Sequence, residues 1–235
     1  MKIDLKIIPF VLISIIHLVL EGMGSPWVQI SKPLLMPVLA FAFYSSTLKE
    51  NASIAHAILL SLFLSFLGDV FLLKSQSSTT FFLLGLGSFL LAHLSYIRIF
   101  SKLHWGSTMR IDSKYLVGLI LYLLIFLALT WQGLDLMLKI AVPVYALILL
   151  GMLYGSLSLW LRNKESQNTK YILIGAILFV LSDSLIGMSR FSGLALPEWV
   201  YRLGIMCTYI LAQYLIVRGI SGFIKATNLS AEQQN

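Results

Sequence analysis

The chain has 235 residues, of which 58% are hydrophobic and 11% charged, and its mean hydropathy is +0.89. A water-soluble domain carries about a quarter charged residues, so this composition excludes one and predicts an integral membrane protein. The net charge of +7 does not indicate nucleic-acid binding, because Lys and Arg fall between apolar segments rather than along one face. Cys207 is the single cysteine, which excludes an intramolecular disulfide.

Eight apolar runs follow one another along the chain, each close to the roughly 20 residues that cross a bilayer. We expect an all-α polytopic membrane protein with transmembrane helices at residues 5–21, 33–48, 52–73, 79–99, 114–131, 135–160, 170–189 and 198–220. The first run resembles a secretory signal, but the rest of the chain is also membrane-spanning, which favours a retained helix. Short connections predict a single domain over residues 1–226 and a disordered cytoplasmic tail over residues 227–235.

Lys and Arg at the helix ends predict the orientation in the membrane. With the N-terminus inside, the inner ends collect Lys2, Lys6, Lys49, Arg98, Lys102, Arg110, Lys114, Arg162, Lys164, Lys170, Arg218 and Lys225. The outer ends receive only Lys32, Lys74, Lys139, Arg190 and Arg202. Because cytoplasmic loops carry the excess of positive charge, we expect both termini in the cytoplasm, and the inner membrane as the location if the source is bacterial.

Two aspartates interrupt apolar helices at similar depths. At ~1.5 Å per residue, Asp69 in "SFLGDVFLLK" lies about 6 Å below the outer end of its helix, and Asp183 in "FVLSDSLIGMSR" about 9 Å below. An ionisable side chain inside a membrane segment is costly and marks a functional site, although a single one could also cap a helix or reach the headgroups. Two aspartates in equivalent contexts favour a function.

Further matches indicate a duplication of four helices. "KPLLMPV" and "KIAVPV" each place a lysine a few residues before Pro-Val, and "LLAHLSYI" and "ILAQYLIV" align His93 with Gln213. Since four is even, the two halves of this 4+4 pseudo-repeat would be parallel, related by a pseudo-twofold axis along the membrane normal. Asp69 and Asp183 would then face each other and share one proton, because two close carboxylates in a low-dielectric pocket do not both ionise readily.

Five stretches, in their order, resemble the YhhN-like lysoplasmalogenase family of multi-spanning membrane proteins: "KPLLMPVL", "GDVFLL", "AHLSY", "SDSLI" and "YILAQYLIVR". The resemblance covers about seven of the eight expected helices. It implies a hydrolase that cleaves the vinyl ether of a lysoplasmalogen into a fatty aldehyde and glycerophosphocholine or glycerophosphoethanolamine. It also implies that Asp69 and Asp183 are the catalytic pair. The expected partners are therefore a lysophospholipid substrate and membrane lipid, with no prediction of oligomeric state.

The expected chemistry needs an acid and a base together. A vinyl ether hydrolyses by protonation at carbon, which leaves an oxocarbenium-like cation that water captures. A neutral aspartate would donate the proton, while its ionised partner stabilises the cation and orients the water. For the substrate phosphate, the outer helix ends offer Lys32, Arg190 and Arg202, of which Lys32 is favoured because it belongs to a repeated motif.

Four further polar residues are candidates for the substrate site: Glu21, His93, Tyr96 and Gln213. Glu21 lies one helical turn from His17 at the outer end of the first helix, where a headgroup-level pair is the simpler role. His93, Tyr96 and Gln213 lie deeper, where buried hydrogen bonds between helices are the simpler role. Neither a Gly-x-Ser-x-Gly motif nor metal-ligand spacing occurs, so we expect no serine nucleophile, metal or cofactor.

Two other classes of function remain open from the sequence. A proton-coupled transporter of a small solute or lipid would use the aspartate pair as a proton relay, and would need a continuous polar path past His93 and Gln213. A structural or scaffolding membrane protein would instead direct both aspartates toward headgroups and away from each other.

Overall fold

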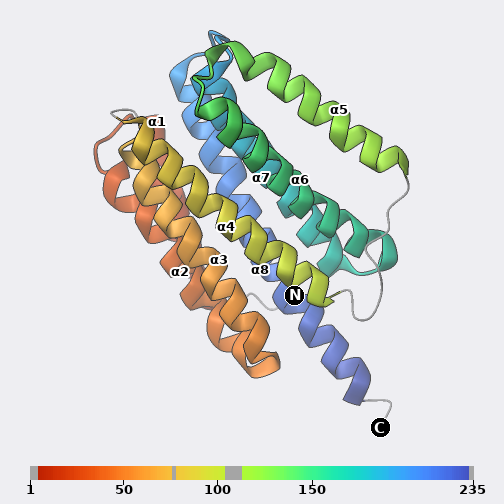
Figure 1. The fold of residues 1–235 in the computed structure, drawn as a ribbon. Coiled ribbons are helices and arrows are strands. Elements are labelled where there is room, and N and C mark those ends of the chain that lie inside the picture. The colour runs from red at the N-terminus through yellow and green to blue at the C-terminus, as the bar shows by residue number, and fades with distance from the viewer. Residues whose placement is uncertain (1–4, 76–77, 104–112, 233–235) are drawn as a thin grey trace.

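The computed structural model describes residues 5–75, 78–103 and 113–232, and in these ranges it is all-helical, as predicted. Its α-helices (Figure 1) are α1 (Ile8–Gly22), α2 (Val28–Glu50), α3 (Ala52–Leu73), α4 (Thr79–Leu103), α5 (Ser113–Thr130), α6 (Leu138–Arg162), α7 (Gln167–Phe191) and α8 (Glu198–Glu232). Seven candidate spans are long and apolar enough to cross a membrane, and α2 holds a shorter apolar stretch, Val28–Tyr44. The chain is therefore an integral multi-pass membrane protein.

The observed helices match the predicted ones closely, except at the start of α2 and the end of α8. Helix α2 begins at Val28, well before residue 33, and α8 continues to Glu232, although the sequence predicted a helix end at 220 and disorder from 227. The expected membrane span stops where the sequence becomes polar, but the helix continues. Its last turns are packed against the bundle, since Ile224 is buried and Asn228 Nδ2 donates to the Glu50 carbonyl oxygen at 3.2 Å. Lys2, Arg110 and residues 233–235, which entered the orientation and tail predictions, lie outside the described residues.

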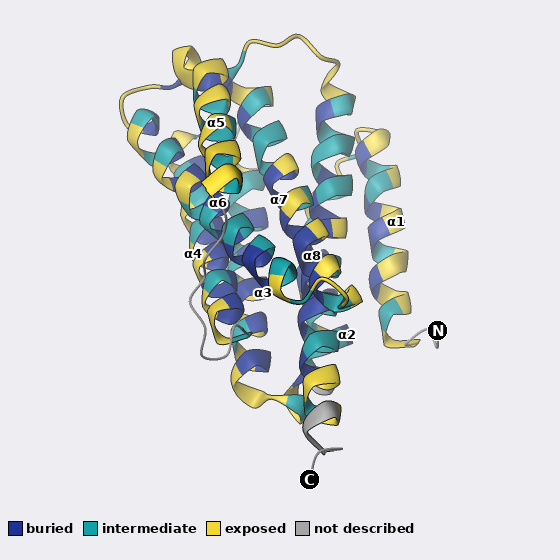
Figure 2. Ribbon diagram, turned by 90° about the vertical axis from the view of Figure 1, so that its right-hand side faces the viewer, coloured by how far each residue is buried: buried dark blue, intermediate teal, exposed yellow. Residues whose placement is uncertain are grey.

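Six helices form a closed ring in the order α2, α3, α4, α6, α7 and α8, in which each packs against the next and α8 packs against α2. Helix α1 packs on the outside of α2 and α8, and α5 on the outside of α6 and α7 (Figure 1). Buried side chains from all six ring helices meet in one apolar core. Figure 2 shows this burial on the inner faces, whereas α5 is largely exposed.

Helices α7 and α8 approach each other closely because glycine lies at their contact. A Cβ at Gly175 would lie 2.8 Å from Ile216 Cγ1 and 2.9 Å from the carbonyl oxygen of Ala212. Lipid is as apolar as leucine, so helices in a bilayer associate through such close packing rather than through a hydrophobic driving force. Gly175 therefore sets the spacing of the two helices on which Asp183 and the polar residues of α8 lie.

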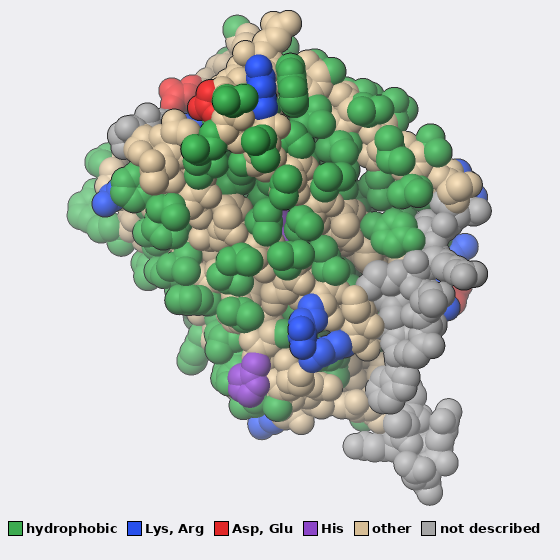
Figure 3. All heavy atoms as spheres, viewed as in Figure 1, with side chains coloured by type: hydrophobic (Ala, Val, Ile, Leu, Met, Phe, Trp, Pro, Cys, Tyr) green, Lys and Arg blue, Asp and Glu red, His purple; other side chains and the backbone are tan. Residues whose placement is uncertain are grey.

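The outer surface of the bundle is apolar. Large hydrophobic side chains stand exposed on every helix from α1 to α8. In Figure 3 they cover most of the visible face, and charged side chains gather toward its two ends. This distribution suits a protein whose middle is surrounded by lipid hydrocarbon and whose ends reach the headgroups.

Candidate functional site

Asp183 on α7 is held by side chains from two other helices. Tyr145 of α6 donates its hydroxyl to Asp183 Oδ2, and His93 of α4 places Nε2 3.4 Å from the same oxygen. The Tyr145 hydroxyl also lies 3.0 Å from His93 Nε2, so the three groups touch one another. Among the described residues, His93 Nδ1 is buried without a hydrogen-bond partner. The carboxyl group is thus fixed in one orientation in surroundings that are otherwise apolar, as a proton-transfer group requires.

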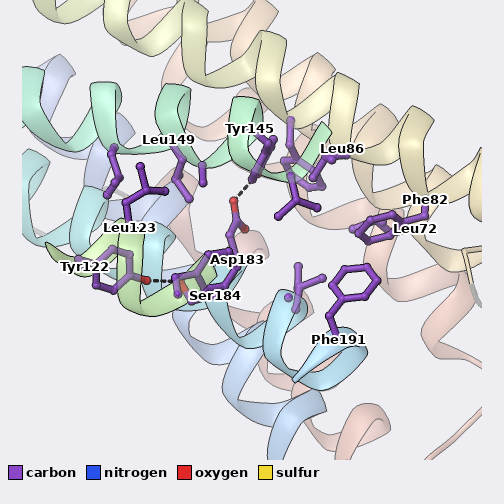
Figure 4. Close-up of a pocket in the computed structure, with 17 residues that line it drawn as sticks. Leu72, Phe82, Leu86, Tyr122, Leu123, Tyr145, Leu149, Asp183, Ser184 and Phe191 are labelled. Atoms are coloured by element: carbon purple, nitrogen blue, oxygen red, sulfur yellow. Dashed lines mark hydrogen bonds between the residues drawn. The ribbon is translucent and has the colours of Figure 1, made fainter. Parts of the chain in front are cut away.

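Asp183 lines a narrow cavity of about 50 Å³ between α4, α5, α6 and α7 (Figure 4). Its other polar groups are the hydroxyls of Tyr145, Tyr122 and Ser184, and the last two hydrogen-bond each other. The rest of the wall consists of apolar residues, among them Leu72, Phe82, Leu86, Leu123, Leu149 and Phe191. An apolar cavity with a few polar groups at one place is typical of a site for a small molecule or a lipid.

Asp69 on α3 has partners of its own. Tyr209 of α8 donates its hydroxyl to Asp69 Oδ2 at 2.7 Å, and Lys32 Nζ of α2 lies 4.0 Å from Asp69 Oδ1. The Asp69 side chain is buried and is not among the residues that line the Asp183 cavity. The sequence predicted two close carboxyl groups in one pocket, whereas Asp69 lies outside the Asp183 cavity and is covered by its own tyrosine and lysine.

Aromatic rings are packed between the partners of the two aspartates. Phe179 lies edge-to-face on His93, with ring centroids 4.7 Å apart, and on Tyr209, with centroids 5.7 Å apart. Phe89 packs on Tyr209 as well, at 5.9 Å. Within the described ranges no hydrogen bond joins the two carboxyl groups, so the predicted direct sharing of a proton is absent.

A wider cleft of about 580 Å³ lies at the end of the bundle that the sequence predicts to face outward. Lys32, Arg190 and Arg202 line it. Arg190 donates to the Ser75 carbonyl oxygen at 2.7 Å, and its guanidinium lies 4.3 Å from the centroid of the Phe82 ring. The cleft and the Asp183 cavity share three lining residues, Leu72, Phe82 and Ile186. The three predicted cations thus line one cleft next to the Asp183 cavity, together with the Glu198 carboxylate, and such cations are the groups that bind a phosphate.

Glu21 on α1 is not among the described residues that line the cleft, but it contacts Arg202, which does line it. Its Oε2 lies 3.7 Å from Arg202 Nε, and its Oε1 lies 3.8 Å from His17 Nε2. His17 Nδ1 is in turn 2.8 Å from Ser31 Oγ, and Arg202 Nη1 is 3.2 Å from Glu198 Oε1. Glu21 therefore pairs with Arg202 and with His17, and the pair with His17 is the simpler role that the sequence predicted.

Tyr96 and Gln213 hydrogen-bond each other away from both cavities. The Tyr96 hydroxyl donates to Gln213 Oε1 at 2.7 Å, and Gln213 Nε2 donates to Ser65 Oγ at 2.9 Å. This buried chain ties α4, α8 and α3 together. For Tyr96 and Gln213 the structure thus contains the simpler of the two predicted roles, a hydrogen bond between helices. His93 lies on the same face of α4 as Tyr96 but contacts Asp183.

Sequence reasoning missed the two tyrosines that hold the aspartates. Tyr145 directly follows the Pro-Val of the repeated motif, and Tyr209 opens the stretch "YILAQYLIVR". A buried tyrosine hydroxyl needs a hydrogen-bond partner, and this requirement is the signal that could have linked each tyrosine to a carboxyl group. In the part of the chain that the structure describes, no three His, Cys, Asp or Glu side chains are grouped so that they could hold a metal ion.

Neither a curated protein nor a solved structure matches the sequence. The model of the YhhN family matches residues 27–220, which include both aspartates, His93, and the three cations of the cleft. Because this match covers far more than half of the sequence, the chain belongs to the YhhN family.

Proposed function

We propose that the protein is a membrane hydrolase that cleaves the vinyl-ether bond of a lysoplasmalogen into a fatty aldehyde and a glycerophospho-base. One observation carries the proposal. Asp183, with Tyr145 and His93 against its carboxyl group, stands in an apolar cavity beside a cleft lined by three cations. An amphiphile with one hydrophobic part and one phosphate suits this pairing. Membership of the YhhN family is consistent with a hydrolase.

In the proposed reaction Asp183 acts first as an acid and then as a base. The carboxyl proton goes to the vinyl carbon on the chain side, where the C=C electron pair forms the new C–H bond. An oxocarbenium ion remains at the carbon that carries the ether oxygen, next to the Asp183 carboxylate. A water oxygen bonds to this carbon while the carboxylate takes the water proton, which gives a hemiacetal. The glycerol oxygen then leaves with a proton from Asp183, and the hemiacetal hydroxyl returns its proton to Asp183 as the aldehyde forms.

The neighbouring polar residues support this step. Tyr145 and His93 are positioning residues, because both contact Asp183 Oδ2 and fix its direction. Asp69 has the same status in the proposal, since it holds the Lys32 ammonium at the edge of the phosphate cleft and lies outside the cavity. Of the predicted catalytic pair, Asp183 is therefore the reacting group and Asp69 its support.

We also infer that all eight helices cross the membrane, with both termini in the cytoplasm, and that the chain is a four-helix duplication. The ring order supports the duplication, because exchanging α2, α3 and α4 for α6, α7 and α8 maps each neighbouring pair of the ring onto another neighbouring pair. The fourth pair follows this exchange in part, since α1 packs on α2 and α8 whereas α5 packs on α6 and α7. The partners of the aspartates agree: Asp69 is held from α2 and α8, and Asp183 from α6 and α4, which the same exchange relates. Helix α2 belongs to this ring, which favours a span despite its short apolar stretch.

A proton-coupled transporter is the alternative, and the cavities argue against it. A second open pocket of about 830 Å³ lies at the opposite end of the bundle. Within the described residues it shares no lining residue with the Asp183 cavity or the cationic cleft. Fully buried Phe100, Met152 and Ile216 lie along the intervening stretches of α4, α6 and α8, so the polar path that transport needs is interrupted.

The proposal is tested with purified protein and a lysoplasmalogen in deuterated water. Released aldehyde is reduced at once to the alcohol with borohydride, which stops hydrogen–deuterium exchange at the carbon next to the carbonyl. The mass of the alcohol is then measured by mass spectrometry. Protonation at carbon predicts one deuterium on the carbon next to the former carbonyl. Absence of aldehyde release would refute the hydrolase. Cleavage at the glycerol carbon would release an enol that also takes up deuterium, so a parallel reaction in H₂¹⁸O identifies the broken bond. Capture of an oxocarbenium ion by water leaves the released glycerophospho-base without ¹⁸O, and ¹⁸O in that product would refute the proposed mechanism.

A further inference from the structure

Next to the Asp183 cavity lies an apolar groove that the proposed reaction does not use. This groove, about 330 Å³ in volume, lies between α5 and α6 and is lined by Leu116, Leu119, Ile120, Leu123, Leu147, Leu150, Gly151 and Tyr154. It shares Leu123 and Leu150 with the Asp183 cavity. The cavity in turn shares residues with the cationic cleft, so the three spaces lie next to one another in the order cleft, cavity and groove.

The three spaces are ordered along the depth of the bundle. The cleft lies at the outer helix ends, the cavity follows, and the groove reaches toward the inner half. From Val142 in the cavity to Tyr154 in the groove, α6 rises about 18 Å at ~1.5 Å per residue. This length exceeds half of the roughly 30 Å hydrocarbon core, so the groove can follow a long aliphatic chain downward from the site.

The way α5 is packed leaves this groove open on one side. Helix α5 is the least buried of the seven candidate spans, and it contacts only the outer side of the ring. Phe126 holds it against α7 near the cavity, where a Cβ at Gly187 would lie 2.7 Å from Phe126 Cζ. Further down, Leu116 and Ile120 line the groove and are 47% and 49% exposed, so the groove opens to surrounding lipid.

We infer that the groove between α5 and α6 binds the single hydrocarbon chain of a lysophospholipid whose phosphate lies at Lys32, Arg190 and Arg202. The identity of the reacting bond at Asp183 rests on the proposed function, but the chain site does not. The cations lie at one end of the three adjoining spaces and the apolar groove at the other. This order matches a lysophospholipid, which has its phosphate at one end and its hydrocarbon chain at the other. The cavity between the cleft and the groove is narrow, about 50 Å³, which favours a lipid with one chain over a lipid with two.

A photoreactive probe tests the site directly. Purified protein is irradiated with a lysophosphatidylcholine that carries a diazirine at the end of its acyl chain, and the labelled peptides are mapped by mass spectrometry. We expect adducts concentrated in residues 116–123 and 147–154, displaced by excess unlabelled lysophosphatidylcholine and not by diacyl phosphatidylcholine. Equal labelling of other lipid-facing positions, such as Phe41 and Phe63, or labelling that no competitor displaces, would overturn the inference and identify ordinary lipid contact.

A matched pair of variants localises the passage. Leu123 lines both cavity and groove, whereas neighbouring Leu124 lines neither and is 58% exposed. Leu123→Trp should reduce labelling of residues 147–154 at least tenfold, and Leu124→Trp should leave it unchanged. Should Leu123→Trp not fold, Ile120→Trp on the open side of the groove gives the same test. Wild-type labelling in the folded blocking variant would contradict the inference.

The probe also separates this inference from the proposed function. It carries an ester in place of the vinyl ether, so labelling requires no hydrolysis. Displaceable labelling of the groove without any cleavage of a lysoplasmalogen would refute the hydrolase and leave the chain site standing. Cleavage of the lysoplasmalogen together with scattered labelling would refute the chain site and leave the hydrolase standing.

Discussion

Tyr145→Phe removes one hydroxyl group from the candidate site and leaves the ring that lines the cavity. This hydroxyl donates to Asp183 Oδ2 and lies 3.0 Å from His93 Nε2, so its loss leaves the carboxyl group with His93 as its one remaining partner among the described residues. We expect a lower kcat with little change in KM, because the hydroxyl positions the reacting group and the chain still meets the same apolar wall.

The size of the effect follows from the lost hydrogen bond. A hydrogen bond to a charged group contributes about 1.5–3 kcal/mol. Since about 1.36 kcal/mol of activation free energy corresponds to a tenfold change in rate, the loss in kcat should be roughly 10- to 150-fold.

The assay is the initial rate of aldehyde release from a lysoplasmalogen in detergent micelles, measured over a range of substrate concentrations. Tyr209→Phe is the matched control, because it removes the same hydroxyl from Asp69, which lies outside the cavity. The kcat of Tyr209→Phe should fall clearly less than the kcat of Tyr145→Phe. An unchanged kcat in Tyr145→Phe, or an equal loss in both variants, would refute the assignment of different roles to the two aspartates.

Three further predictions concern stability and phosphate binding. Lys32→Met leaves the buried Asp69 carboxylate without a cation and should lower the free energy of unfolding by up to about 3 kcal/mol. Adding Asp69→Asn should restore most of this stability, and thermal melts of the single and double variants measure both effects. Gly175→Ala should destabilise the protein by about 1–3 kcal/mol, because the new Cβ meets the α8 backbone. Gly118→Ala is the control: its Cβ meets nothing within 4 Å, so it should be neutral or stabilise by up to ~1 kcal/mol, and the two melting temperatures are compared. Arg190→Gln should raise KM for the lysoplasmalogen roughly tenfold with kcat nearly unchanged, since the side chain lines the cationic cleft and not the Asp183 cavity. A fall in kcat with an unchanged KM would contradict a role of Arg190 in binding the phosphate.

The helices could be predicted from the sequence because seven of them contain an apolar run long enough to cross a bilayer and α2 contains a shorter one. The end of α8 could not be predicted in this way, since apolarity measures the membrane span and not the length of the helix. Ile224 continues the buried face beyond residue 220, and the polar residues after it are compatible with a helix. Helix and membrane span therefore differ in extent wherever a helix projects from the lipid.

The aspartates could also be found from the sequence, because a carboxyl group in an apolar helix is rare. Their partners could not, because a helix that meets neighbours on two sides and lipid on the third is apolar all around, and no periodicity reveals its inner face. Tyr145 and Tyr209 consequently looked like ordinary aromatic residues of α6 and α8. Phe89 and Phe179 looked like ordinary core residues as well, although they pack between the partners of the two carboxyl groups.

The rate of aldehyde release by Asp183→Asn protein tests the central claim most directly. Asparagine keeps the shape of the side chain but cannot donate the proton to carbon, and general acid–base groups contribute about 10²- to 10⁴-fold to a rate. In protein with an unchanged melting temperature, we predict a loss of at least about 100-fold for Asp183→Asn and a smaller loss for Asp69→Asn. An Asp183→Asn variant that releases aldehyde at the wild-type rate would contradict the account.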